Sequence, residues 1–135
     1  MKVIKKILLQ TLCLSLFWGT ACQNRDPEQD ARTQAEILAP LQNQEIAYGE
    51  VLDIRALLRH PIELHAYTIT IKAMPKDSAV YFVYGHQHTR ELEVQQVWQN
   101  LMDYPSDMLL ELVTYDHNNT VDTLHLRFRS AAPLE

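Results

Sequence analysis

Apolar and polar residues alternate along most of the chain after Ala35, in short runs separated by turn residues. Successive side chains of a β-strand point to opposite faces, so alternation with period two indicates a strand with one buried face. The clearest run is 50–58, whose inner face is predicted to be Leu52, Ile54, Ala56 and Leu58. A second run, 64–73, is expected to direct Tyr67, Ile69 and Ile71 inward.

Weaker runs predict further strands at 36–39, 46–48, 79–84, 108–115 and 121–129. Turn residues bound them, and His60-Pro61 is expected to interrupt the chain between the two clearest runs. The segment 91–98 alternates without a clear inner face, so it is either a strand or, with the residues up to 102, a short helix. The runs on either side of Asp116-His-Asn-Asn119 predict a terminal hairpin.

About seven short strands without a long helical period predict an all-β fold, an immunoglobulin-like antiparallel β-sandwich over residues 35–130. The only cysteines, Cys13 and Cys22, both precede this region. The predicted domain therefore has no internal disulfide, and its stability must come from its apolar core.

The N-terminus has the layout of a secretory signal peptide, predicted over residues 1–21. Three lysines, Lys2, Lys5 and Lys6, precede the mainly apolar run 7–18. This run is shorter than the about 20 apolar residues that a transmembrane helix needs. The signal predicts export to the cell envelope.

Small residues, Gly19-Thr-Ala21, stand immediately before Cys22 and resemble the bacterial lipobox. The resemblance implies that Cys22 is lipidated and that the chain is anchored to a membrane, expected to be the outer membrane. Simple cleavage after Ala21, leaving a free thiol, is the alternative. The polar residues 22–34 are then the lipidated cysteine and a flexible tether.

The net charge of the whole chain is −5, from 12 basic and 17 acidic residues. Without residues 1–21, 9 basic residues stand against the same 17 acidic ones, a net charge of −8. An acidic chain argues against nucleic acid as a partner. The serines stand in no Gly-x-Ser-x-Gly context, so nothing predicts a hydrolase, and we expect a non-catalytic protein that binds an envelope protein or a glycan.

Three segments resemble a family of Bacteroidota lipoproteins, the domain-of-unknown-function family numbered 4625. They are Glu36-Ile-Leu-Ala-Pro40, Tyr48-Gly-Glu50 and Leu64-His-Ala-Tyr-Thr-Ile-Thr-Ile71. The resemblance extends over most of residues 35–129. It implies an immunoglobulin-like domain on a cell-envelope lipoprotein and implies no activity.

Gly85-His86-Gln87-His88 is the segment that most suggests chemistry. In a strand, His86 and His88 project to one face and reach one metal ion, and Glu91 is placed to add a carboxylate. Such a set of nitrogen and oxygen donors suits Zn²⁺ or Cu²⁺. The alternative is a solvated hairpin end at which the two histidines are merely polar.

The other four histidines are expected to have structural roles. His65 is predicted to be half-buried with its hydrogen bonds satisfied, and His125 to lie on the outer face of its strand. His60 is predicted to lie in a loop and His117 in a turn. The aromatic residues of 79–84 and the pair Trp98 and Tyr104 either serve the core or form a binding surface, and we expect the core. Asp77-Ser78-Ala79 resembles an acceptor site of envelope O-glycosylation, with Ser78 as the modified residue.

Overall fold

The computed structural model describes residues 32–134 and builds that region from strands alone. The strands are β1 (Gln34–Ala39), β2 (Glu45–Ile46), β3 (Val51–Ala73), β4 (Ser78–Gln99), β5 (Ser106–Asp116) and β6 (Val121–Ser130). No helix that is suited to crossing a membrane is found in this part of the chain. The predicted signal peptide, Cys22 and the tether up to residue 31 lie outside the described residues.

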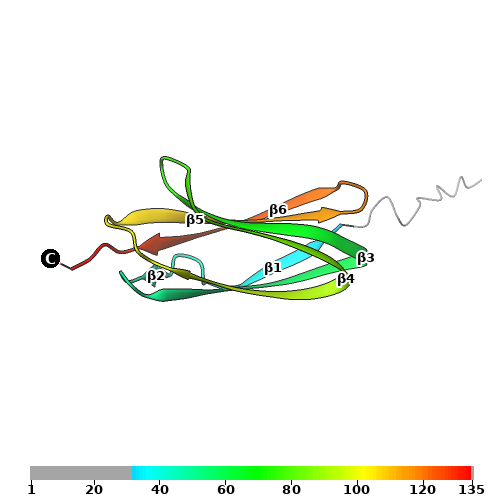
Figure 1. Ribbon diagram of the computed structural model, residues 1–135, viewed down its shortest axis with the longest axis horizontal. Coiled ribbons are helices and arrows are strands. Elements are labelled where there is room, and N and C mark those ends of the chain that lie inside the picture. Colours follow the sequence, from blue (N-terminus) through cyan, green and yellow to red (C-terminus); the bar gives the residue numbers. More distant parts are fainter. Residues whose placement is uncertain (1–31, 135) are drawn as a thin grey trace, which may run out of the picture.

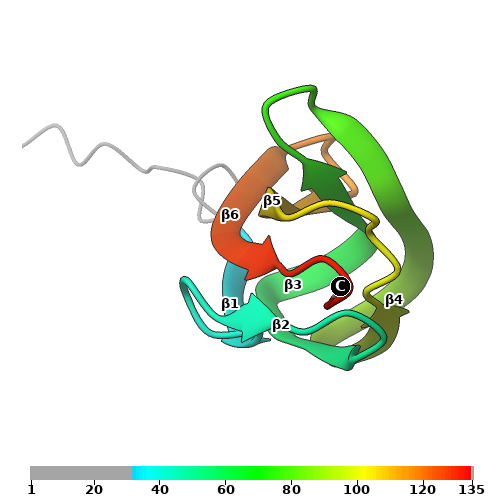
Figure 2. The same ribbon diagram turned by 90° about the vertical axis from the view of Figure 1, so that its left-hand side faces the viewer.

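All six strands belong to one curled sheet with the order β1-β3-β5-β6-β2, in which β4 pairs with β3. β1 pairs with the first half of β3, and β5 pairs with its second half, while β4 follows β3 along its whole length. The long β3–β4 hairpin therefore runs through both layers of a sandwich (Figures 1 and 2). Every pairing is antiparallel except that of β2 with β6.

The core lies between the two layers and includes the residues that the alternation of β3 assigned to it. In β3, the predicted inner residues Leu52, Ile54, Ala56 and Leu58 are at most 2% exposed. Ile69 and Ile71 of the same strand are completely buried, and Phe128 of β6 packs edge-on against Trp98 of β4. The period-two pattern therefore predicted the inner face of β3 correctly.

The interruption that we expected at His60-Pro61 is wrong, because β3 continues through both residues. Between the pairs Arg59–Glu91 and Leu64–Thr89, β3 has four residues where β4 has only Arg90. This large bulge leaves Pro61 without a ladder partner, so its missing N–H costs no hydrogen bond. The inward-facing residues of β3 stay even-numbered through this bulge, as far as Leu64, and become odd-numbered from Tyr67, after a second irregularity between Leu64 and Ala66.

The segment 91–98 is a strand, and the helical alternative is wrong. It forms the second half of β4, with Val94 and Trp98 buried. The aromatic residues near the beginning of β4 are divided between the two faces of the strand. Tyr81 packs against the core, whereas Phe82 and Tyr84 are 63% and 55% exposed, so the expectation that all of them serve the core is also wrong.

The predicted fold class, an all-β immunoglobulin-like sandwich, is confirmed. About seven strands were expected and the described region has six, because β3 and β4 each join two of the eight runs named above, 91–98 included. Because the two long strands are continuous, the polar residues near the middle of β3 and of β4 lie close to one another.

Candidate metal centre

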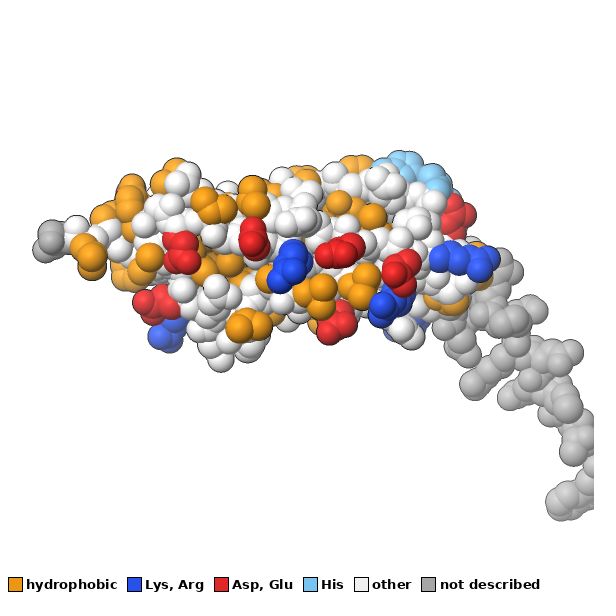
Figure 3. Space-filling view, turned by 90° about the horizontal axis from the view of Figure 1, so that it is seen from below, with side chains coloured by type: hydrophobic (Ala, Val, Ile, Leu, Met, Phe, Trp, Pro, Cys, Tyr) orange, Lys and Arg blue, Asp and Glu red, His pale blue; other side chains and the backbone are white. Residues whose placement is uncertain are grey.

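Four of the six histidines gather at the bend of the β3–β4 hairpin. His65 lies just after the bulge of β3, His86 and His88 lie on β4, and His117 lies in the turn between β5 and β6. Figure 3 shows histidine side chains together at this end of the molecule, with acidic side chains beside them. Glu63, the last residue of the bulge, contacts two of the four histidines.

Short contacts between ring nitrogens link the cluster. Nε2 of His86 lies 3.0 Å from Nε2 of His88, and Nδ1 of His88 lies 3.0 Å from Nε2 of His117. The Glu63 carboxylate is 3.0 Å from Nδ1 of His88 and 3.7 Å from Nε2 of His117. A neutral imidazole carries a single N–H, so a proton on Nδ1 of His88 would have to be shared between two acceptors.

The rings also pack against one another. The centroid of His65 is 4.5 Å from that of His86 and 4.6 Å from that of His117, and His88 stacks on His117 at 4.9 Å. These contacts gather the four imidazoles into one compact group.

One donor atom from each of His65, His88 and His117 lies within 4.8 Å of the other two. Zinc–nitrogen bonds of 2.0–2.1 Å place the donors of a tetrahedral site about 3.3 Å apart. The closest pair of ring nitrogens, at 3.0 Å, already has this spacing. The wider distances mean that a bound ion would draw the rings together.

His65 differs from its prediction as a satisfied histidine, because its Nδ1 is buried and has no hydrogen-bond partner in the described structure. It is the extra residue of a second bulge, in which Leu64 and Ala66 pair with the adjacent Asp116 and Tyr115. Burial and, after it, the neighbouring imidazoles lower the pKa of His65, while the Glu63 carboxylate opposes them. The ring is therefore neutral near neutral pH, which is the form that binds metal ions.

The turn that carries His117 is held by the buried Asp116, of which 3% is exposed. One oxygen of Asp116 accepts hydrogen bonds from the backbone amides of Asn118 and Thr120, at 2.8 and 2.7 Å. Burial raises the pKa of Asp116, but these bonds and His60 outweigh it, and the pKa ends below its ordinary value. The carboxylate is consequently charged and fixes the turn next to the cluster.

His60, which we had assigned to a loop, is buried within β3 and faces the same carboxylate. Its Nδ1 accepts the amide hydrogens of Ile62 and Glu63, at 3.2 and 2.8 Å. The ring proton of neutral His60 is therefore on Nε2, which lies 3.7 Å from Asp116. His60 is thus hydrogen-bonded to the bulge that carries Glu63 and lies beside the turn that carries His117, with no hydrogen bond to Nε2 in the described structure.

The predicted site residues fall into different places. His86 and His88 lie side by side in the middle of β4, so the alternative of a solvated hairpin end does not describe their position. Glu91 forms an ion pair with Arg59 at 2.8 Å and is not part of the cluster. Ser78 is exposed at the start of β4, and Cys22 lies outside the described residues.

Sequence reasoning missed three members of the cluster, Glu63, His65 and His117. Glu63 and His65 are neighbours on β3, but only the fold brings them to His117 and to the His-x-His pair of β4. The one available signal was the number of histidines, six within residues 60–125. His125 remains apart from the cluster and pairs with Glu111 at 3.0 Å.

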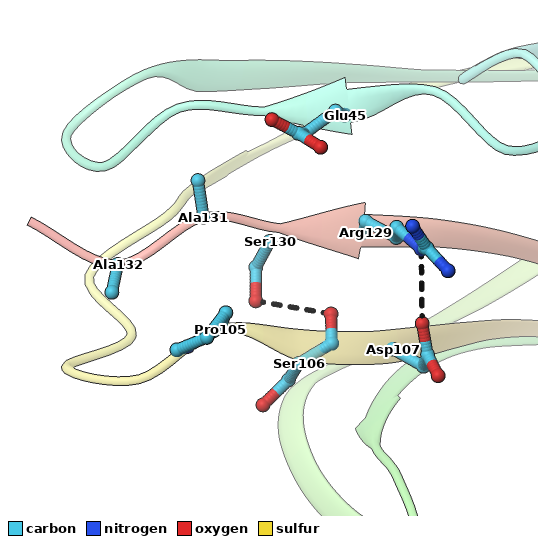
Figure 4. Close-up of a pocket in the computed structure, with 8 residues that line it drawn as sticks. All are labelled: Glu45, Pro105, Ser106, Asp107, Arg129, Ser130, Ala131 and Ala132. Atoms are coloured by element: carbon cyan, nitrogen blue, oxygen red, sulfur yellow. Dashed lines mark hydrogen bonds and ion pairs between the residues drawn. The ribbon is translucent and has the colours of Figure 1, made fainter.

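A shallow pocket at the other end of the sandwich offers much less chemistry (Figure 4). Two of its three charged side chains pair with each other, Arg129 with Asp107 at 3.2 Å. The hydroxyl of Ser130 donates to the backbone oxygen of Ser106. The pocket contains no histidine or cysteine, so the histidine cluster is the stronger candidate site.

No family model matches the chain, and no curated protein is significantly similar to it. Among solved structures, CopC from Methylosinus trichosporium OB3b is similar over 76% of this chain and 98% of its own, with 12% identity and a TM-score of 0.45. A CARDB domain from Pyrococcus furiosus, in complex with di-metal ions, is similar over 75% and 94%, with 9% identity and a TM-score of 0.42. A β-glucosidase from Listeria innocua in complex with glucose matches 77% of this chain over 17% of its own, with 11% identity and a TM-score of 0.44. These similarities concern the course of the backbone and carry no argument about function.

Proposed function

We propose that this protein binds a transition-metal ion through His65, His88 and His117. The observation that carries the proposal is the convergence of three imidazole nitrogens, from β3, β4 and the β5–β6 turn, within 4.8 Å. Imidazole suits both zinc and copper, so the proposed ions are Zn²⁺ and Cu²⁺. His86, which the sequence predicted to share an ion with His88, contacts Nε2 of His88 and is not one of the three proposed ligands.

Two further features support this proposal. The unpartnered Nδ1 of His65 is buried at the cluster, and a ligand there would satisfy a polar atom that otherwise costs free energy. The bulges of β3 and the anchored turn hold the ligands on a rigid frame, which reduces the cost of ordering them when an ion binds.

The test is a calorimetric titration of the full-length protein with Zn²⁺ and with Cu²⁺, in a mild detergent because of the apolar run 7–18. We expect one ion per chain with a dissociation constant below about 1 μM, or roughly −8 kcal/mol. At a free-ion concentration of about 100 times this constant, binding should stabilise the fold by about 2.7 kcal/mol and raise its melting temperature.

Two variants make this test specific. His88→Ala removes the central ligand and should abolish binding in this range. His125→Ala removes an equally exposed histidine that lies outside the cluster, and it should leave binding unchanged. Failure of the wild-type protein to bind, or unchanged binding by His88→Ala, would refute the proposal.

We further propose that the site belongs to an exported lipoprotein, anchored to the outer membrane through Cys22. The support is the N-terminal sequence pattern, together with the resemblance of the later segments to Bacteroidota lipoproteins. Mass spectrometry of the protein purified from a bacterial host would show a diacyl or triacyl group on Cys22. A chain that begins at Cys22 with a free thiol would contradict this part of the proposal.

A second function, binding of an envelope protein or a glycan without catalysis, is favoured by the exposed aromatic rings of Phe82 and Tyr84. Both belong to β4, which also carries His86 and His88. A Phe82→Ser/Tyr84→Ser double variant should retain metal affinity and lose a partner that copurifies with the wild-type protein. Equal recovery of such a partner with both proteins would contradict a role for these rings.

A further inference from the structure

Glu63 approaches the same atom of His88 that faces His117. Its Oε1 lies 3.0 Å from Nδ1 of His88, and its Oε2 lies 3.7 Å from Nε2 of His117. The two ring nitrogens are themselves 3.0 Å apart. These three separations are close to the about 3.3 Å between donors of a tetrahedral metal site. A nitrogen of each ring and the carboxylate therefore surround one point.

His86 does not share this arrangement. It contacts Nε2 of His88, the nitrogen on the opposite side of the ring. An ion bound at Nδ1 of His88 therefore meets Glu63 before it meets His86. Glu63 contacts only two of the three histidines and lies outside the group of donors that are all within 4.8 Å of one another, so a bound ion would have to draw its carboxylate in. It is the nearest candidate for a donor beyond the three histidines.

The carboxylate is placed by the bulge and not by a cation. The amide of Glu63 donates to His60 at 2.8 Å, and the carbonyl of Ile62 accepts from the Arg90 side chain at 3.0 Å. Among residues 32–134, the ion pairs of Glu63 are with His88 and His117, and no lysine or arginine neutralises it.

We propose that Glu63 is the fourth ligand and makes the centre selective for divalent over monovalent ions, an inference that rests on the proposed metal binding. Three neutral imidazoles contribute no charge, so a divalent ion bound by them alone keeps its full double charge within the cluster. One carboxylate halves that charge. Soft monovalent ions such as Cu⁺ and Ag⁺ prefer sulfur or nitrogen ligands and gain less from a carboxylate oxygen.

The experiment measures Zn²⁺ and Ag⁺ affinities of the full-length protein by competition with chelators of known affinity; Ag⁺ serves as a monovalent probe that does not change oxidation state. Glu63→Gln retains the shape of the side chain and removes its charge. Glu91→Gln is the matched control, since it changes an exposed glutamate of the same hairpin bend that pairs with Arg59. Urea denaturation in the presence of a chelator establishes that all the variants are equally folded.

Glu63→Gln should weaken Zn²⁺ binding at least tenfold, since the loss of partners that merely orient a ligand already costs about 10–100-fold. Its Ag⁺ affinity should stay within about threefold of wild type, and Glu91→Gln should change neither. Unchanged Zn²⁺ affinity in Glu63→Gln overturns the inference while metal binding stands. Equal losses for the two ions would assign Glu63 to holding the histidines and would also overturn it. A wild-type protein that binds neither ion refutes the proposed function itself.

Discussion

Replacing Asp116 by asparagine tests whether one buried carboxylate holds the turn beside the histidine cluster. The charged oxygen accepts two amide hydrogen bonds, from Asn118 and Thr120. Hydrogen bonds to a charged group contribute about 1.5–3 kcal/mol each, against about 0.5–1.5 kcal/mol for neutral pairs. Two such differences predict a loss of about 2 kcal/mol in the free energy of unfolding. The amide NH₂ of asparagine would also face the N–H of His60, which adds to the loss.

The pH dependence gives this prediction a sign. The pKa of Asp116 is lowered in the folded protein, so the carboxylate contributes stability above its ordinary pKa. That contribution disappears as the pH falls through the lowered, folded-state pKa. Asparagine does not titrate. The difference in the free energy of unfolding between wild type and Asp116→Asn should therefore be largest near neutral pH and should decrease in acid.

Urea denaturation of the metal-free, full-length protein at a series of pH values measures this difference. Asp107→Asn is the control, because Asp107 is 71% exposed and its ion pair with Arg129 should contribute less than about 1 kcal/mol. A loss below about 0.5 kcal/mol in Asp116→Asn, or a difference that does not narrow in acid, would refute the reasoning.

Three further predictions concern the frame of the sandwich, and each is measured by urea denaturation. Asn100→Ala should cost about 3 kcal/mol or more, because the completely buried side chain donates to three backbone carbonyls and accepts from one amide; a cost below 1 kcal/mol would contradict this account. Gly85→Ala should lower the free energy of unfolding by about 1–3 kcal/mol, since the added Cβ would clash with the ring of the buried Tyr67. An unchanged free energy of unfolding would mean that the ring moves aside without cost. Arg59→Gln should change stability by less than about 1 kcal/mol because its ion pair with Glu91 is exposed, and a larger loss would show that the pair fixes the bend.

The lipidation of Cys22 stays a prediction, because residue 22 lies outside the described residues. The resemblance to Bacteroidota lipoproteins also stays a prediction, since no family model matches the chain. The His-x-His pair was recognised from spacing, since i and i+2 share a face of any strand. The structure adds that both histidines lie in mid-strand, where the bend of β3 and β4 gives them neighbours. Glu91 was predicted as a metal ligand because it is close to His88 along the chain, but its side chain forms an ion pair with Arg59.

The sequence by itself determined which residues of the clearest run, 50–58, face the core. Leu52, Ile54, Ala56 and Leu58 are buried as their alternation required, because facing in a strand is a local property that repeats every two residues. The hairpin turn at Asp116-His-Asn-Asn119 follows for the same reason, since turn chemistry acts over a few neighbouring residues.

Only the tertiary structure decided that β3 crosses Pro61, and that His65, His117 and Glu63 meet His88. The change of inward parity between Leu58 and Tyr67 required an irregularity, but its size and direction depend on pairing with β4 and β5. Register across strands is set by packing between segments far apart in the chain. The residues of the candidate site are brought together by such long-range pairing. The sequence therefore predicted only the two histidines of β4 and not the residues that come from β3 and from the β5–β6 turn.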